Sequence, residues 1–294
     1  MDAADLRIFE TVARLGGMTR AAAELHTVQS NVTARIRALE DELGTPLFER
    51  SSRGVALTAA GHRLLPYAVR VRHLLEDARQ AVEDEGTPAG PLTLGSLETT
   101  AALRLSPLLS TYLAKYPEVD LILRTGTTRE LTEAVLEHRV EGAFVCGPVS
   151  HPELDAETIF REELAIFTAP AVEGLDELVK QGDLKIVVLR IGCSYRQRLE
   201  DILAKRGVVG ARLLEFGTLE AIVGCVAAGL GVTLLPKALI GPVWPDGRVA
   251  VHELAAADAI VDTVFIRRRD GFVSSALAAF LQCVRPPEPH RSAR

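Results

Sequence analysis

A short polar segment divides the sequence into two parts with different patterns. Residues 83–91, Glu-Asp-Glu-Gly-Thr-Pro-Ala-Gly-Pro, combine acids, glycines and prolines, a composition typical of a linker. The pattern before this segment is helical throughout, whereas short β-branched runs alternate with helical stretches after it. We therefore predict an all-helical head of about 85 residues and an α/β body of about 200, which suits a two-domain chain.

The composition excludes several classes of protein. With 48% hydrophobic and 24% charged residues, the chain of 294 is neither disordered nor collagen-like. A net charge of −6 gives no general affinity for nucleic acid, so any DNA-binding surface must be local. The four cysteines are scattered, the acidic N-terminus differs from a signal peptide, and no apolar run approaches about 20 residues. These features predict a soluble cytoplasmic protein.

Seven short apolar runs in the body predict strands. They lie at residues 92–95, 119–125, 143–146, 164–168, 186–189, 231–235 and 262–266. Their alternation with helical stretches is typical of βαβ units. We therefore expect a mainly parallel, buried sheet.

Two short helices open the head. An apolar stripe from Leu6 to Ala13 predicts a helix that ends at the glycine pair 16–17. Thr19 has a side chain that can cap a second helix over residues 21–25. A turn of two residues then leads into a third helix.

The third helix, residues 28–43, has two contrasting faces. Its apolar positions recur at intervals of four, three and four residues: Val32, Ile36, Leu39 and Leu43. Its opposite face carries small, polar and basic side chains: Ser30, Asn31, Thr33, Ala34 and Arg37. A tight turn followed by such a helix predicts a helix-turn-helix with this face in the major groove of DNA.

Two extended arms around Arg-Ser-Ser-Arg-Gly follow at residues 46–58 and predict a wing. Arg50 and Arg53 are then placed for contacts with the DNA backbone or minor groove. From Arg14 to Arg72, nine arginines face five acids, a local charge of +4. The alternative is a three-helix bundle with solvated arginines.

A fourth helix over residues 58–83 carries a narrow apolar seam. Its positions are spaced alternately by four and three residues: Leu64, Ala68, Val71, Leu75, Ala78 and Val82. A period of 3.5 is typical of a coiled coil, so we expect Val71 and Leu75 to face a partner chain. The alternative is a helix that packs on its own body. Pro66 should kink or restart the helix.

The head carries a long, ordered set of motifs. They are Leu6, Phe9 and Val12-Ala13; Thr19-Arg20-Ala21-Ala22 and Leu25; Gln29-Ser30 and Val32; Ile36-Arg37-Ala38-Leu39-Glu40; Leu43-Gly44-Thr45-Pro46-Leu47-Phe48-Glu49-Arg50; and Leu57-Thr58-Ala59-Ala60-Gly61. The body adds Gly95-Ser96, Thr99-Thr100 and Ala227-Ala228-Gly229-Leu230-Gly231-Val232. Over nearly its whole length the chain resembles LysR-type transcriptional regulators.

The resemblance implies a winged helix-turn-helix with a long dimerisation helix, followed by a periplasmic-binding-protein-like α/β effector domain of two subdomains. The expected boundaries are 1–58 for the DNA-binding domain, 59–90 for the linker helix and hinge, and 91–294 for the effector domain. The implied partners are a double-stranded DNA operator, a small-molecule effector, RNA polymerase and further copies in a homodimer or homotetramer. No cofactor is implied.

The DNA-binding residues expected on the motifs are Thr19, Arg20, Gln29, Ser30, Asn31, Thr33, Ala34, Arg35, Arg37, Arg50 and Arg53. Ala34 stands where the family commonly has arginine, with Arg35 following it, and Thr33 replaces the usual serine. These departures leave the groove assignment in place and bear on which operator sequence is read.

Small hydroxyl residues recur at four predicted strand ends in the body. The expected effector-binding residues are Ser96, Glu98, Thr99, Thr100, Thr125, Thr127, Thr128, Cys193, Ser194 and Thr218. Helix N-termini at the carboxyl ends of strands bind anions, so we expect a small anionic metabolite between two α/β halves. Arg196 is the one obvious basic side chain there. The alternative is that each hydroxyl only caps a helix.

Two other functions remain as alternatives. An enzyme is disfavoured, because the histidines lack metal-ligand spacing and the motif at residues 192–196 lacks the second glycine of a nucleophile elbow. Glu98 and Glu220 could form a carboxylate pair, although glutamates at helix starts usually interact with the dipole. Cys146, Cys193 and Cys225 permit a thiol-based redox sensor of the same fold.

Overall fold

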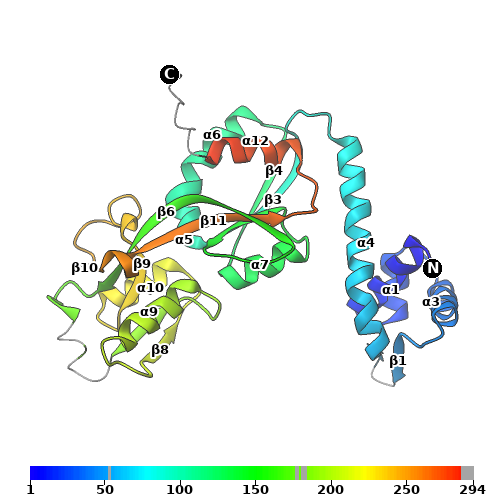
Figure 1. Cartoon of the computed structure of the whole chain (residues 1–294), viewed down its shortest axis with the longest axis horizontal. Helices are drawn as coiled ribbons and strands as arrows, with labels where there is room; N and C mark the ends of the chain where they lie inside the picture. The colour runs from blue at the N-terminus through cyan, green and yellow to red at the C-terminus, as the bar shows by residue number, and fades with distance from the viewer. Residues whose placement is uncertain (52–53, 176–178, 180–183, 286–294) are drawn as a thin grey trace. The chain divides into compact units, whose positions relative to one another are not determined.

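The computed structural model describes residues 1–51, 54–175, 179 and 184–285 (Figure 1). Contacts within the chain divide it into two units, Met1–Asp84 and Glu85–Arg294. Among the helices of the described residues, none has the length and apolar character needed to cross a bilayer.

The first unit consists of four helices and a two-stranded hairpin. Its elements are α1 (Ala3–Leu15), α2 (Met18–Glu24), α3 (Gln29–Leu43), β1 (Phe48–Ser51), β2 (Gly54–Leu57) and α4 (Ala59–Glu83). Helices α1 and α3 end at Gly16 and Gly44, whose φ angles of 63° and 66° favour glycine. Phe9, Val32 and Ile36 are fully buried in one core. The predicted helix-turn-helix and wing hairpin are both present.

The start of α2 differs from the prediction. The helix begins at Met18, its N-cap is Gly17, and no side chain caps it, so the capping role predicted for Thr19 is wrong. The cause is that the helix starts three residues earlier than its apolar pattern indicated, which places Thr19 inside the first turn.

Helix α4 runs without interruption through Pro66, so the restart predicted there does not occur. The two halves of its predicted seam have different environments. Leu64, Ala68 and Val71 pack against the core of their own unit. Leu75 and Val82 are exposed, by 48% and 85%. Val71 is half-buried against its own unit, which favours the alternative at this position, and the expectation that Leu75 faces a partner chain stays a prediction.

The second unit contains a seven-stranded sheet and a two-stranded sheet. The strands are β3 (Gly90–Ser96), β4 (Val119–Thr125), β5 (Gly142–Cys146), β6 (Leu154–Thr168), β7 (Lys185–Val188), β8 (Arg212–Glu215), β9 (Thr233–Pro236), β10 (Ala250–Glu253) and β11 (Ile260–Arg268). The large sheet has the order β10-β6-β11-β5-β3-β4, with β9 also paired to β6. Strand β6 begins ten residues before the predicted run, and β8 and β10 were not predicted.

The large sheet is mixed, which corrects the expectation of a mainly parallel sheet. Strand β3 is parallel to β4 and β5, whereas β11 is antiparallel to β5 and β6, and β6 is antiparallel to β9 and β10. Helices cover both faces of the sheet, so a buried apolar run looks the same in either direction.

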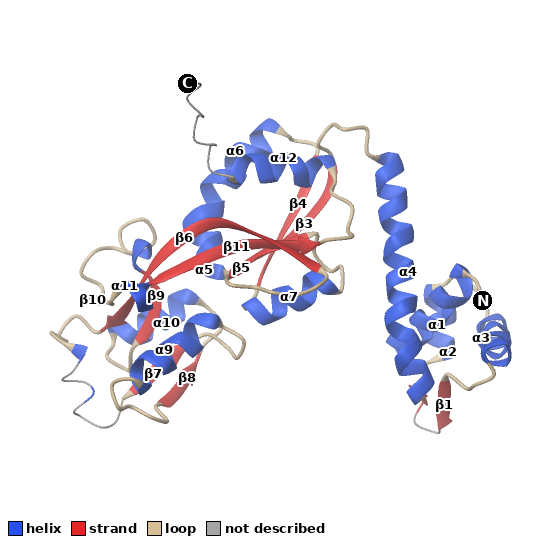
Figure 2. Ribbon diagram, in the orientation of Figure 1, coloured by secondary structure: helices blue, strands red, loops and turns tan. Residues whose placement is uncertain are grey.

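The helices of this unit are α5 (Glu98–Thr100), the π-helical η1 (Ala101–Leu105), α6 (Ser106–Lys115), α7 (Thr128–Leu136), α9 (Ser194–Ala204), α10 (Leu219–Ala227), the 3₁₀ turn η2 (Lys237–Leu239), α11 (Ala256–Ala259) and α12 (Ser275–Val284). Successive side chains of β5 point to opposite faces. Ala143 and Val145 belong to the core shared with α7, and Phe144 belongs to the core under α6 and α12 (Figure 2).

Strands β6 and β11 connect two subdomains. The first half of β6 pairs with β11 beside β3, β4 and β5. Its second half pairs with β9 and β10, in the subdomain that also holds the parallel pair β7–β8 with α9 and α10 (Figure 2). The chain therefore passes twice between the subdomains, and the strand ends of both meet where it crosses.

Candidate functional site

The exposed face of α3 carries the residues predicted to contact DNA. Gln29, Ser30, Asn31, Ala34 and Arg37 are exposed, and Thr33 is half-buried. The side-chain amide of Gln29 donates to Thr33 Oγ1 at 3.1 Å, and that of Asn31 donates to Thr27 Oγ1 at 3.0 Å. Thr19 and Arg20 are exposed near the start of α2. The face is polar and open, as a groove-binding helix requires.

Arg35 does not belong to this exposed face. Its guanidinium pairs with Asp5 at 2.8 Å and with Asp2 at 3.3 Å, both at the start of α1. The pKa of Asp2 is lowered, first by the backbone N–H of Asp5 and then by Arg35. The expected DNA contact from Arg35 therefore competes with two carboxylates of its own unit.

Two more arginines of the head are tied to acids. Arg14 lies 3.5 Å from the buried Glu10 and also pairs with Glu24. Arg72 on α4 pairs with Glu76 at 3.0 Å. The local charge of +4 thus overstates the free positive charge of the head, because acids just outside the counted segment neutralise part of it. Arg37 makes no hydrogen bond or ion pair with any described residue and remains free.

The wing hairpin pairs Arg50 on β1 with Val55 on β2 in antiparallel register. Arg53 lies outside the described residues, so its predicted DNA contact stays a prediction.

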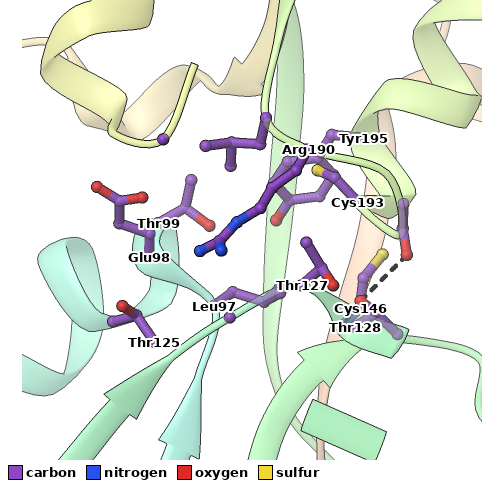
Figure 3. A pocket seen from close by; sticks show the side chains of 14 residues that line it. Leu97, Glu98, Thr99, Thr125, Thr127, Thr128, Cys146, Arg190, Cys193 and Tyr195 are labelled. Carbon is purple, nitrogen blue, oxygen red and sulfur yellow. Dashed lines mark hydrogen bonds between the residues drawn. The ribbon is translucent and has the colours of Figure 1, made fainter. Parts of the chain in front are cut away.

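A pocket lies in the second unit where the strand ends of its two subdomains meet (Figure 3). About 510 Å³ of space around it, part of it open solvent, is unfilled by protein atoms. Its lining residues are Leu97, Glu98, Thr99, Thr125, Gly126, Thr127, Thr128, Cys146, Leu189, Arg190, Cys193, Ser194, Tyr195 and Gly217.

Seven of the ten predicted effector-binding residues line this pocket: Glu98, Thr99, Thr125, Thr127, Thr128, Cys193 and Ser194. Ser96 is fully buried and its hydroxyl donates to Leu97 O, and Thr100 is buried. Thr218 caps α10 by accepting from Ala221 N–H. None of these three residues lines the pocket.

Two of the helix starts around the pocket are already occupied by protein carboxylates. Thr127 and Glu130 form a reciprocal capping box on α7, with Thr127 N–H donating to Glu130 Oε2 at 2.8 Å. At α10, Leu219 N–H donates to Glu98 Oε1 at 3.0 Å, although Glu98 belongs to the other subdomain. The expectation that free N–H groups at these helix starts hold an anion therefore fails for Thr127 and Glu130 at α7 and for Leu219 at α10, whose N–H groups bond to protein atoms.

Several contacts join the two subdomains across the pocket. Ser194 donates its hydroxyl to Thr128 Oγ1 at 3.1 Å. Gly192, with φ of 100°, brings the loop before α9 so close to α7 that a Cβ there would lie 2.9 Å from Thr127 Oγ1. The pocket is thus held together by polar contacts that separation of the subdomains would break.

The cationic side chain of the pocket is Arg190, which sequence reasoning missed. Figure 3 shows its guanidinium extending from the end of the β7 segment into the pocket, on the side of Glu98 and Thr99. Arg196, the expected base, pairs instead with Glu200 at 3.2 Å and Glu215 at 3.4 Å and does not line the pocket. Arg190 could have been found as the only basic residue between the predicted strand 186–189 and the 192–195 motif.

The sulfur and phenol groups of the pocket stay neutral at ordinary pH. Burial raises the pKa of Cys146 to about 11, and burial also raises the pKa of Cys193. The pKa of the Tyr195 phenol is likewise raised, chiefly by burial. A thiol sensor needs an accessible thiolate, so this environment disfavours redox sensing by Cys146 or Cys193. Within the described part of the chain, no cluster of histidine, cysteine or acidic side chains could hold a metal ion.

Comparison with known proteins identifies both units. Residues 3–62 match the model of the bacterial regulatory helix-turn-helix proteins of the lysR family, and residues 85–286 match the LysR substrate binding domain. The chain belongs to the LysR family. Members of this family are transcriptional regulators, and the predictions of a winged helix-turn-helix and of a regulatory rather than enzymatic function are confirmed.

Relatives within the family match over nearly the whole chain. The transcriptional regulator GltR of Bacillus subtilis is 43% identical over 95% of this chain and 95% of its own length. YofA of Bacillus velezensis is 40% identical over 96% of each chain. Among solved structures, a full-length OxyR variant from Pseudomonas aeruginosa has a TM-score of 0.71 at 22% identity, covering 97% of this chain and 94% of its own. CbnR in complex with its target DNA has a TM-score of 0.63 at 24% identity, covering 97% and 99%.

Proposed function

We propose that this LysR-family regulator binds a small metabolite with an anionic group in the pocket between its two subdomains and that this binding changes its action on an operator. The observation that carries the proposal is Arg190, a guanidinium without a hydrogen-bond partner among the described residues and the one basic side chain among the residues that line the pocket. An arginine fork matches carboxylate geometry. The hydroxyls of Thr99, Thr125 and Thr128 can complete the binding of such a ligand.

The proposed DNA contacts lie on α3 and the wing. Ser30 and Arg37 are assigned to base edges or phosphates in the major groove, and Arg50 and Arg53 to the backbone or minor groove. CbnR, solved with its target DNA, supports this use of the fold. In this proposal residues 1–58 bind DNA, residues 59–90 form the linker helix and hinge, and residues 91–294 bind the effector. Such a regulator acts in the cytoplasm, with RNA polymerase as its further partner.

The proposed assembly is a homodimer, or a tetramer built from dimers, joined through the outer half of α4. Leu75 and Val82 are exposed on one side of that helix, a pattern that a second copy of the helix would cover. Replacing both with glutamate should give a monomer in light scattering without loss of helical circular dichroism. An unchanged mass would show that the subunits associate elsewhere.

The experiment that tests the function is selection of bound fragments from genomic DNA with the purified full-length protein, followed by footprinting. We expect two protected half-sites about one helical turn apart. Metabolites of the genes beside the recovered sites are then tested for a change in the footprint. Fragments bound without sequence preference, at the salt concentration of the cell, would contradict the proposal.

A further inference from the structure

The pocket contains two opposite charges that do not neutralise each other. Glu98 and Arg190 both line it, and no ion pair joins them among the contacts of the described residues. The two side chains come from different subdomains, Glu98 from the start of α5 and Arg190 from the segment after β7 (Figure 3). Each therefore faces the space where a ligand would lie.

Neither charged group is saturated by the protein. The Glu98 carboxylate accepts one hydrogen bond from a described residue, Leu219 N–H on Oε1, which leaves Oε2 open. Arg190 approaches Glu130 at 3.8 Å, a distance too long for a hydrogen bond, and its side chain is 53% exposed. A ligand can thus bind both groups without breaking a hydrogen bond that the protein already makes.

The surrounding charges disfavour a ligand that is only an anion. Glu130 stays ionised, since its pKa is lowered first by the backbone N–H of Thr127 and also by Arg190 and Arg129. A simple carboxylate on Arg190 would therefore lie near two protein carboxylates, Glu98 and Glu130, and like charges in a partly buried site repel each other. A cationic group on the same ligand, placed against Glu98, converts one of these repulsions into an attraction.

We propose that the effector is a zwitterion of the amino-acid type, with its carboxylate bound by Arg190 and its ammonium group bound by Glu98. The hydroxyl of Thr125, which makes no hydrogen bond to a described residue, supplies a further acceptor or donor at the same wall. The inference rests on the proposed function, since it names the chemical class of the ligand for the same pocket.

The test uses full-length protein and a panel of probes in calorimetry. The panel contains L-amino acids and short ω-amino acids, each with two matched compounds of the same carbon chain: the acid without the amino group and the amine without the carboxylate. We expect at least one amino acid to bind at least tenfold more tightly than both of its matched compounds.

Two variants assign the roles of the two charges. Glu98→Gln keeps an oxygen to accept from Leu219 N–H and removes only the charge, so it should abolish the preference for the amino acid over its matched acid. Arg190→Gln should lower the affinities for the amino acid and for its matched acid, each by at least tenfold. Arg196→Gln, a nearby arginine outside the pocket, is the control and should leave both affinities unchanged.

The outcomes separate this inference from the proposed function. If an acid binds the parent protein as tightly as its matched amino acid, and its affinity falls in Arg190→Gln, the zwitterion proposal is overturned. The same result supports the pocket as the effector site. An amino acid whose preference survives Glu98→Gln also overturns the zwitterion proposal. If no amino acid of the panel binds, the inference is wrong, and the footprinting experiment decides the proposed function independently.

Discussion

The exposed face of α3 and the pocket of the second unit are built from the same kinds of side chain in opposite environments. On α3 the groups assigned to DNA, such as Ser30 and Arg37, are exposed and follow one another along one helix. In the pocket, Thr127, Thr128 and Ser194 already make hydrogen bonds within the protein. A surface residue can thus be changed with little effect on folding, whereas a pocket hydroxyl serves both folding and binding.

The largest contrast is expected between two arginines of α3. Arg37→Ala should weaken operator binding by about 1–3 kcal/mol, because a free guanidinium on the groove face is lost. Arg35→Ala should change operator affinity much less, since Arg35 is already paired with Asp2 and Asp5. Fluorescence anisotropy at one fixed salt concentration measures both affinities. Equal losses in the two variants would mean that Arg35 leaves its carboxylates and turns to the DNA.

The pocket gives a smaller contrast between two threonines. Thr127→Val removes the N-cap of α7 and the hydroxyl contact with Glu130, so it should lower the free energy of unfolding by about 0.5–2 kcal/mol. Thr125→Val removes an exposed hydroxyl that bonds to no described residue, so stability should remain unchanged. Urea denaturation of both variants checks this difference. Parent stability in the Thr127 variant would show that the capping box contributes nothing and would leave Thr127 free for the ligand.

The smallest effect concerns alkaline pH. The Cys146 thiol ionises near pH 9.0 when unfolded, whereas its folded pKa is about 11, so the folded state holds its proton longer. The contribution of this thiol to the free energy of unfolding is therefore fully present below pH 9 and is lost as the pH rises toward 11. Cys146→Ala should flatten part of that decline in thermal melts between pH 8 and about 10.5. The same environment predicts slow reaction with peroxide at pH 7, and rapid sulfenic acid formation at Cys146 would contradict it.

Much of the first unit could be predicted because its signals are local. Apolar positions at helical spacing identify the buried faces of α1 and α3. The glycines at 16 and 44 mark where these two helices end. The same local periodicity could not show that Val71 packs partly against the core while Leu75 stays exposed, because both occupy the seam and only their tertiary surroundings differ. Periodicity identifies a face of a helix but not what covers it.

In the second unit, the sequence by itself determined that small hydroxyl residues follow successive strands, and five of those predicted to bind the effector line one pocket. Only the tertiary structure decided that the sheet is mixed, that Glu98 reaches the start of α10, and that Arg190 rather than Arg196 enters the pocket. The physical reason is that a turn or a helix end depends on neighbours along the chain. The partner of a charge depends on which distant segments fold beside it, and no local pattern records that choice.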